Sequence, residues 1–208
     1  MCFSATASFA TGIALTGVGV ATLEQTKTKR EIPLALFPLL FGVQQLIEGF
    51  VWLSLTRGSY ALNTISTCSY TFFSHIFWPM FVPFAVALVE ANPGRKRILR
   101  GFQVAGMAIG LYTLYAFFQS PVTSSIINHS IVYEVDLFHK VLITGFYVTI
   151  VCGSFFVASD RLLNVFGALL LVGFLTAYYF YTLAFVSVWC FFAAILSIVV
   201  YLYLKNRS

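Results

Sequence analysis

Charge is the scarcest property of this sequence. Only seven Asp and Glu and twelve Lys and Arg occur among 208 residues, which is 9% of the chain, whereas soluble domains carry about a quarter. Because so few charged side chains cannot cover a water-facing surface, a soluble globular fold is excluded. The basic residues fall in short clusters between apolar runs, not along an aromatic-studded groove, so no nucleic-acid partner is predicted.

Several patterns that would assign the chain to a known class are also absent. Its four cysteines form no Cys-x-x-Cys pair and no His-Glu-x-x-His motif occurs, so neither spacing typical of a zinc site is present. No fixed-period repeat, low-complexity tail or long linker divides the chain. We therefore expect one integral-membrane helical domain over residues 1–208.

Long apolar runs fill most of the sequence. Apolar residues make up 60% of the chain, aromatic residues make up 18%, and the mean hydropathy is +0.90. A membrane-spanning helix needs about 20 mainly apolar residues. The last two runs are separated only by a tight break near Ala184, so a single long bent helix is the alternative there. We predict an all-α bundle of seven transmembrane helices at Thr6–Leu23, Pro33–Leu55, Cys68–Glu90, Leu99–Phe118, Phe138–Ala158, Leu162–Leu183 and Phe185–Leu204.

The basic residues alternate between the two sides of the predicted membrane. Connections after the first, third and fifth runs are basic, as is the C-terminal tail, whereas the other connections hold only Arg57, and Lys140 lies just inside the fifth run. Since cytoplasmic loops carry the excess of Lys and Arg, we predict the N-terminus outside and the C-terminus in the cytoplasm. This prediction rests on Lys27, Lys29, Arg30, Arg95, Lys96, Arg97, Arg100, Arg161, Lys205 and Arg207.

Prolines and small residues mark expected irregularities and contacts in the spans. Pro38, Pro79 and Pro83 should kink or locally break their helices, which neighbouring helices in a bundle tolerate. Small side chains allow helices to approach closely. The small residues expected at such contacts are Gly12, Gly17, Gly19, Gly101, Ala105, Ala108 and Gly110.

Ionisable side chains inside spans are costly, so each one needs a partner or a function. Glu48 lies in the second run, and Gln44 and Gln45 share one broad helical face with it. His75 lies in the third run, and His139 opens the fifth. The predicted topology places Glu48, His75 and His139 at one depth, in the outer half of the membrane. A site for a water-borne substrate or ion must open to one aqueous phase, so this asymmetry indicates function.

One Glu and two His suit zinc or another divalent transition metal, which could hold an activated water in an open position. We therefore predict Glu48, His75 and His139 as metal ligands. A satisfied hydrogen-bond network and an ion or proton path remain open as alternatives.

Two further positions are predicted to contribute chemistry. Removal of the initiator Met would leave Cys2 with a free amine and a thiol, which could attack a substrate or ligate the metal. Packing at a helix start, or a disulfide with Cys68 or Cys190, is the alternative. Tyr179 is a candidate to stabilise an oxyanion together with Gln44 or Gln45. The tyrosines around it could equally form an interfacial aromatic belt.

Two segments carry a family resemblance. The opening Met-Cys-Phe-Ser-Ala-Thr-Ala-Ser-Phe and the later Phe-Gly-Val-Gln-Gln-Leu-Ile-Glu-Gly resemble a family of small bacterial multi-pass membrane proteins of unknown function, over most of the chain. This resemblance implies a bacterial inner-membrane protein. The predicted seven-helix architecture is also similar to that of intramembrane zinc hydrolases, including alkaline ceramidases. Those enzymes place a His-x-x-x-His pair on a late helix, and this sequence lacks one.

These observations lead to one functional hypothesis and two alternatives. We expect a membrane-embedded enzyme that opens to the periplasm and uses metal-bound water to hydrolyse an amide or ester, or to hydrate a small electrophile such as carbon dioxide. The substrate would be a small molecule or a lipid. A proton- or cation-coupled transporter or channel using the same Glu and His residues is the first alternative. A non-catalytic receptor or assembly subunit is the second.

Overall fold

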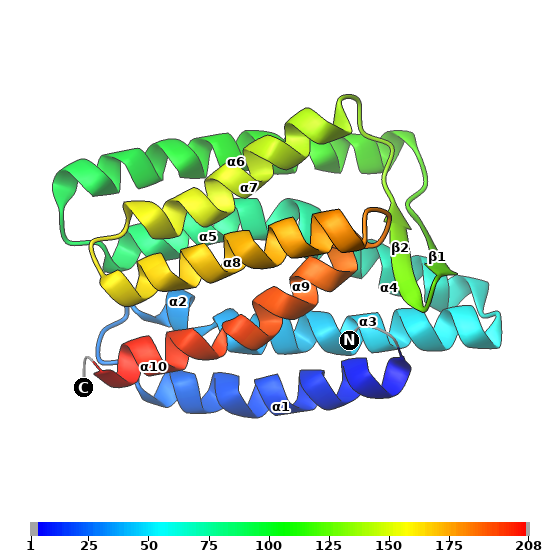
Figure 1. The fold of residues 1–208 in the computed structure, drawn as a ribbon, viewed down its shortest axis with the longest axis horizontal. Helices are drawn as coiled ribbons and strands as arrows, with labels where there is room; N and C mark the ends of the chain where they lie inside the picture. Colours follow the sequence, from blue (N-terminus) through cyan, green and yellow to red (C-terminus); the bar gives the residue numbers. More distant parts are fainter. Residues whose placement is uncertain (1–3, 207–208) are drawn as a thin grey trace.

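The computed structural model describes residues 4–206 as a helical bundle with one small β-hairpin (Figure 1). The helices run nearly parallel to the long axis, and the hairpin covers one end. The elements in chain order are α1 (Ala5–Glu24), α2 (Ile32–Ala35), α3 (Phe37–Arg57), α4 (Tyr60–Thr71), the π-helical segment η1 (Phe72–Phe77), α5 (Trp78–Val89), α6 (Pro93–Gln119), β1 (Thr123–Ile127), β2 (Ser130–Glu134), α7 (Lys140–Val157), α8 (Arg161–Phe180), α9 (Phe185–Leu196) and α10 (Ile198–Asn206).

Seven helical stretches of the described chain are long and apolar enough to cross a membrane, which confirms the predicted number of spans. Three of them are composite: α2 with α3, α4 with η1 and α5, and α9 with α10. The third begins at Tyr60, earlier than the predicted Cys68. A turn between α8 and α9 separates the last two spans, so the single bent helix is wrong. The chain is thus a multi-pass protein that sits in a lipid bilayer.

The two ends of the bundle differ in charge and in cover. The end that holds the β-hairpin and the turn before α9 is called the hairpin end below (Figure 1). The opposite end, called the basic end, holds the connections α1–α2, α5–α6 and α7–α8 and the end of α10. The described basic residues lie at the basic end, apart from Arg57 and Lys140.

Local sequence signals set several helix boundaries. Side chains of Ser4, Asn92 and Asp160 accept hydrogen bonds from the first free amides of α1, α6 and α8, as N-cap residues do. Two predicted proline effects are present. The second span breaks between α2 and α3, with Pro38 in the first turn of α3, and Pro79 lies in the first turn of α5 directly after η1.

The β-hairpin is a departure from the predicted all-α fold, since the sequence between α6 and α7 was expected to be a loop. Strands β1 and β2 pair antiparallel from Thr123–Glu134 to Ile127–Ser130. The turn residues Asn128 and His129 both have positive φ, as a two-residue hairpin turn requires. Strand β2 is largely buried against the bundle.

Ser124 fastens strand β1 to α4. Its hydroxyl accepts from Asn63 Nδ2 at 2.9 Å and lies 2.7 Å from Thr67 Oγ1. These two contacts hold the hairpin over the end of the bundle, so the hairpin is part of the fold rather than a free loop.

Glycines bring two pairs of helices into close contact. Gly12 and Gly19 of α1 lie against α3, where a Cβ on Gly19 would be 2.6 Å from the Leu39 backbone. Gly110 of α6 lies against Met80. No atom lies within 4 Å of a Cβ built on Gly17 or Gly101, so the predicted contacts at these two positions are wrong.

Glu90 connects the loops of the basic end. Its carboxylate accepts 2.7 Å hydrogen bonds from the Asn92 amide and from both the amide and the hydroxyl of Ser159. Burial raises the pKa of Glu90, but these donors and the nearby Arg95 guanidinium outweigh burial and hold the pKa below the ordinary value of 4.5. The carboxylate therefore joins the α5–α6 connection to the α7–α8 connection.

Candidate functional site

His75 lies in η1, at the middle of the third span (Tyr60–Val89). A π-helix is wider than an α-helix, rare, and frequent at functional sites. The ring Nδ1 of His75 lies 2.8 Å from Ser74 Oγ, and this contact holds the ring. The irregular turn thus presents a fixed imidazole at the core of the bundle.

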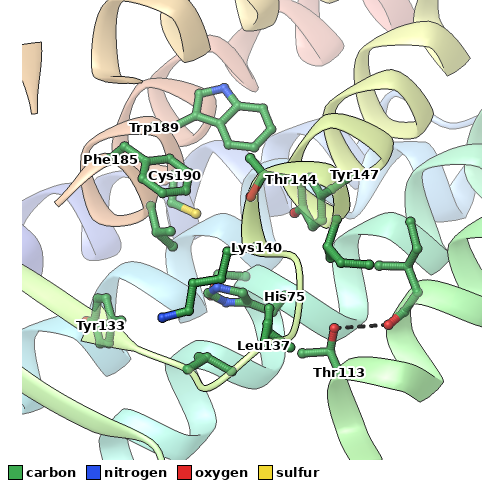
Figure 2. A pocket seen from close by; sticks show the side chains of 15 residues that line it. His75, Thr113, Tyr133, Leu137, Lys140, Thr144, Tyr147, Phe185, Trp189 and Cys190 are labelled. Carbon is green, nitrogen blue, oxygen red and sulfur yellow. Dashed lines mark hydrogen bonds between the residues drawn. The ribbon is translucent and has the colours of Figure 1, made fainter. Parts of the chain in front are cut away.

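A cavity of about 110 Å³ lies beside this imidazole. Five elements surround it: η1, α6, α7, α9 and the end of the hairpin. Figure 2 shows the side chains of Lys140 and His75 in the middle of the view, with Trp189 and Cys190 on the α9 side. The polar groups in its wall belong to His75, Thr113, Tyr133, Lys140, Thr144, Tyr147 and Cys190.

Lys140 is the only Lys or Arg in the cavity wall, at the first turn of α7. His75 belongs to the same wall. A general base and a cation therefore face one small volume, which is a pairing suited to acyl transfer.

A second polar group lies behind the α9 wall of the cavity and is called the Glu48 cluster. Glu48 of α3 is fully buried and accepts a 2.6 Å hydrogen bond from Ser187 Oγ of α9. Gln45 Nε2 donates to the other carboxylate oxygen at 3.3 Å. Gln44 Oε1 accepts from Trp78 Nε1 at 2.7 Å. These contacts join α3, α5 and α9 through polar side chains.

The Glu48 cluster retains unused hydrogen-bonding capacity. Gln44 Nε2, Gln45 Oε1 and Trp52 Nε1 are buried without a hydrogen-bond partner among the residues that the structure describes. A buried polar atom left unpaired costs about 1–3 kcal/mol. The cluster therefore has sites for a further polar group, such as a water molecule or a ligand atom.

Cys190 and Tyr133 connect the cavity with the Glu48 cluster. Both line the cavity and also pack against Trp52 and Tyr70. The rings of Tyr70 and Tyr133 stack with centroids 4.4 Å apart. The cavity and the Glu48 cluster are thus two parts of one polar region at the hairpin end.

Below this region, the bundle is filled by aromatic and aliphatic side chains. Phe37, Phe41, Trp78, Phe155 and Phe166 belong to the main core, and Phe41 stacks on Trp78 with centroids 4.0 Å apart. A small void of about 30 Å³ there has a mainly apolar wall.

Three buried hydroxyls of the basic-end half serve their own helices. Those of Thr22, Ser154 and Ser197 donate to carbonyls within their own helices. These three hydroxyls therefore do not extend the polar region toward the basic end.

The predicted metal ligands do not converge. Among the described residues, no three His, Cys, Asp or Glu side chains are close enough to hold a metal ion. Glu48 lies with Ser187 and Gln45, and His75 lies with Ser74 in the cavity wall. His139 is exposed at the start of α7, where its φ is +59°. A shared depth did not bring three side chains from different helices to one point.

Tyr179 and Cys2 are the other two predicted positions. Tyr179 is 78% exposed near the end of α8, packs edge-on against Phe180 and lies outside the cavity wall. This placement fits the aromatic belt better than a catalytic role. Cys2 lies outside the described residues, so its role stays a prediction.

Several residues of the region were not predicted as members of a site. Ser187, Thr144, Tyr133 and Tyr147 are of types common in any membrane bundle, so their identity alone gave no signal. Lys140 was not predicted as a site residue either, but it did carry a signal, because it is a charged residue inside a predicted span.

Seven membrane-crossing helices around one buried polar region define an integral multi-pass membrane protein. The chain belongs to a family of unknown function, DUF6629, which it matches over residues 1–208. No curated protein and no solved structure matches the chain.

Proposed function

We propose that this protein is a membrane-embedded hydrolase that cleaves an ester or amide, with His75 as general base and Lys140 as the cation that stabilises the oxyanion. One observation supports this most directly: an imidazole and an ammonium group from different elements line the same cavity. A base and an oxyanion stabiliser around one reacting carbonyl are the minimum set for hydrolysis.

The reaction begins with a water molecule between His75 and the substrate carbonyl. His75 Nε2 takes a proton from this water, and the water oxygen bonds to the carbonyl carbon. The carbonyl oxygen gains the electron pair, and Lys140 stabilises its negative charge. When the tetrahedral intermediate collapses, the leaving oxygen or nitrogen takes the proton back from His75, and an acid and an alcohol or amine are released.

The Glu48 cluster positions the wall of this site. Its bond to Ser187 fixes the start of α9 against α3, and Trp189 and Cys190 follow Ser187 within the same turns of α9. Glu48 and Gln45 are therefore positioning residues in this proposal.

No step of the proposed reaction passes through a metal. The donor set predicted from sequence does not form a three-ligand group within the described residues, so the zinc mechanism lacks its centre there.

The proposal includes a location. The hairpin end faces the periplasm and the basic end faces the cytoplasm of a bacterial inner membrane. The excess of Lys and Arg at the basic end supports this orientation.

A transporter or channel using the same residues is less well supported. It needs a polar route to the opposite side of the membrane, whereas Phe37, Phe41, Trp78 and Phe155 fill the space beneath the site. A polar region that ends at this apolar layer suits an enzyme better than an ion path.

Hydrolysis of fluorogenic short-chain esters and amides by purified protein in lipid nanodiscs tests the proposal. We expect the wild type to be active, His75→Gln to lose at least 100-fold in kcat, and Lys140→Gln to lose at least tenfold. His139→Asn is the matched control, because His139 neighbours Lys140 but lies outside the cavity wall. Asparagine also tolerates its positive φ.

Three results would overturn the mechanism. Loss of activity in His139→Asn together with stoichiometric bound metal would restore the metal-dependent reading. An acyl group found on Cys190 by mass spectrometry would replace water attack by thiol attack. Ion flux through proteoliposomes that depends on Glu48, without hydrolysis, would favour the transporter.

A further inference from the structure

The wall of the cavity divides into two chemical halves. His75, Lys140 and Thr113 supply polar groups, whereas Ile143, Val186 and Trp189 supply an apolar surface. A ligand that matches this wall has a polar group joined directly to a hydrocarbon portion. This division of the wall indicates the class of substrate, an inference that rests on the proposed function.

The hairpin restricts access to the cavity from the water at its end of the bundle. Tyr133 and Val135, both buried, and Leu137 form the wall on that side. Asn63 and Thr67 hold the hairpin in this position through Ser124. Lys140 of the wall remains exposed beside this cover, so the cover narrows the approach from water at this end.

The side between α7 and α9 is different. Helix α7 packs mainly on α5, α6 and α8, and α9 packs mainly on α8, α3 and β2. The rings of Tyr147 and Trp189 join α7 to α9 with centroids 5.6 Å apart, and Ile143 and Val186 line the cavity on the hairpin side of this contact. Figure 1 shows α7 diverging from α8 toward the hairpin end. The outward-facing residues there are apolar: Val141 is 77% exposed, Phe146 is 54% exposed and Leu183 is 66% exposed. Such a rim suits lipid and not water.

The volume of the cavity sets the form of the ligand. About 110 Å³ holds roughly seven to eleven water molecules at 10–15 Å³ each. This space accommodates a carbonyl group and the carbons next to it, but not a long hydrocarbon chain. The rest of such a chain would have to lie between α7 and α9, against the apolar rim and the bilayer.

We infer that the substrate is a long-chain acyl ester or amide dissolved in the bilayer, which enters sideways between α7 and α9. Its carbonyl lies between His75 and Lys140. Its acyl chain leaves the cavity past Ile143 and Val186 into the lipid.

Photo-crosslinking tests binding without requiring catalysis. Wild-type protein in nanodiscs is illuminated with a palmitoyl ester that carries a diazirine midway along its chain, and labelled peptides are identified by mass spectrometry. We expect labels on the segments 143–147 and 185–189, competed by unlabelled palmitoyl ester and not by the acetyl ester. Labels spread over all lipid-facing helices, with no competition, would overturn the inference.

Substrate preference tests the same inference by activity. We expect kcat/KM for the palmitoyl ester to exceed that for the acetyl ester of the same leaving group by at least tenfold. Val186→Trp, which narrows the path, should remove most of this preference, measured as the ratio of the two kcat/KM values. Val141→Trp is the control, since Val141 lies on α7 outside the cavity wall.

The failures of the two proposals are distinguishable. Hydrolysis of the acetyl ester that depends on His75, without preference for the long chain and without specific labels, overturns the lipid substrate alone. Specific, competed labels without hydrolysis of either ester overturn the hydrolase and leave the lipid site standing.

Discussion

Gly106 provides the sharpest test of how the helices around the site are packed. This buried glycine of α6 faces α5, and a Cβ built on it overlaps the Pro79 carbonyl oxygen and lies 2.7 Å from the carbonyl carbon. Both atoms belong to the backbone, so no side-chain rotation relieves the overlap. In Gly106→Ala, α5 and α6 must move apart by about 1.5–2 Å at this point to restore ordinary contact distances near 3.5–4.0 Å.

The expected cost follows from two opposing effects. Overpacking of a tight core costs about 1–3 kcal/mol, whereas replacing a helical glycine by alanine gains about 0.8–1.0 kcal/mol. Gly101→Ala is the matched control on the same helix, because no atom lies within 4 Å of its added Cβ, so it keeps only the gain. The two variants should differ by about 1–3 kcal/mol in favour of Gly101→Ala.

Thermal unfolding in detergent, followed by the fluorescence of a thiol-reactive dye, measures this difference. At about 2–4 °C per kcal/mol for a chain of this length, Gly106→Ala should melt about 2–12 °C below Gly101→Ala. Equal melting temperatures in the two variants would refute the close contact between α5 and α6. A Cβ built on the neighbouring Gly110 would lie 3.2 Å from the Ile76 carbonyl oxygen of η1. Movement of α6 should therefore also disturb the segment that holds His75.

Two further predictions concern the ends of the bundle. Since the folded-state pKa of Glu90 is lowered, its stabilisation is fully present above pH 4.5 and is lost as the pH falls through the lowered value. Glu90→Gln should therefore destabilise the protein by about 1–3 kcal/mol at pH 7. Its melting temperature should approach that of the wild type in acid, whereas Glu24→Gln should show no such convergence. At the hairpin end, Ser124→Ala removes the two contacts to α4 and should speed hydrogen exchange of the β1 amides about tenfold. Ser125→Ala is the control and should leave this exchange rate unchanged. Unchanged exchange in Ser124→Ala would mean that other contacts hold the hairpin.

The membrane-crossing pattern follows from the sequence because it depends on length and hydropathy alone. A run of about 20 apolar residues has few alternatives to a spanning helix, and all seven spans are present. Breaks near Pro38 and Pro79 were also predictable, since proline removes a backbone donor wherever it stands in a helix.

The irregular parts of the fold depend on tertiary contacts and were missed. The segment Thr123–Glu134 has few charges and no strong strand alternation, and it becomes a hairpin because β2 packs on the bundle. The π-helical segment Phe72–Phe77 has no composition that separates it from an α-helix. Gly106 was overlooked for the same reason: which glycine meets a neighbouring helix depends on rotation about the helix axis, and sequence defines only position along it.

The difference between position along a helix and rotation about its axis also explains which residues of the candidate site could be predicted. The sequence placed Glu48 and His75 at one level of the bundle, and both lie in the polar region of the hairpin end. It could not show which way each side chain faces around its helix. His139 therefore emerges on the surface, while Lys140, the next residue, enters the cavity wall.

The polar region lowers the stability of the fold, and its location reflects this cost. Three buried polar atoms without described partners together oppose folding by several kcal/mol at about 1–3 kcal/mol each, so they persist only where the surrounding packing is secure. That packing is supplied by the glycine contacts of α1 with α3 and by the stacked rings of Phe41 and Trp78 directly beneath. Replacing the Glu48 cluster by apolar residues of similar volume, such as Glu48→Met and Gln45→Met with Ser187→Ala, should therefore leave the fold intact or more stable. If the proposed hydrolase is correct, the same replacement reduces activity by shifting α9, and this opposition between stability and activity distinguishes a functional polar region from a purely structural one.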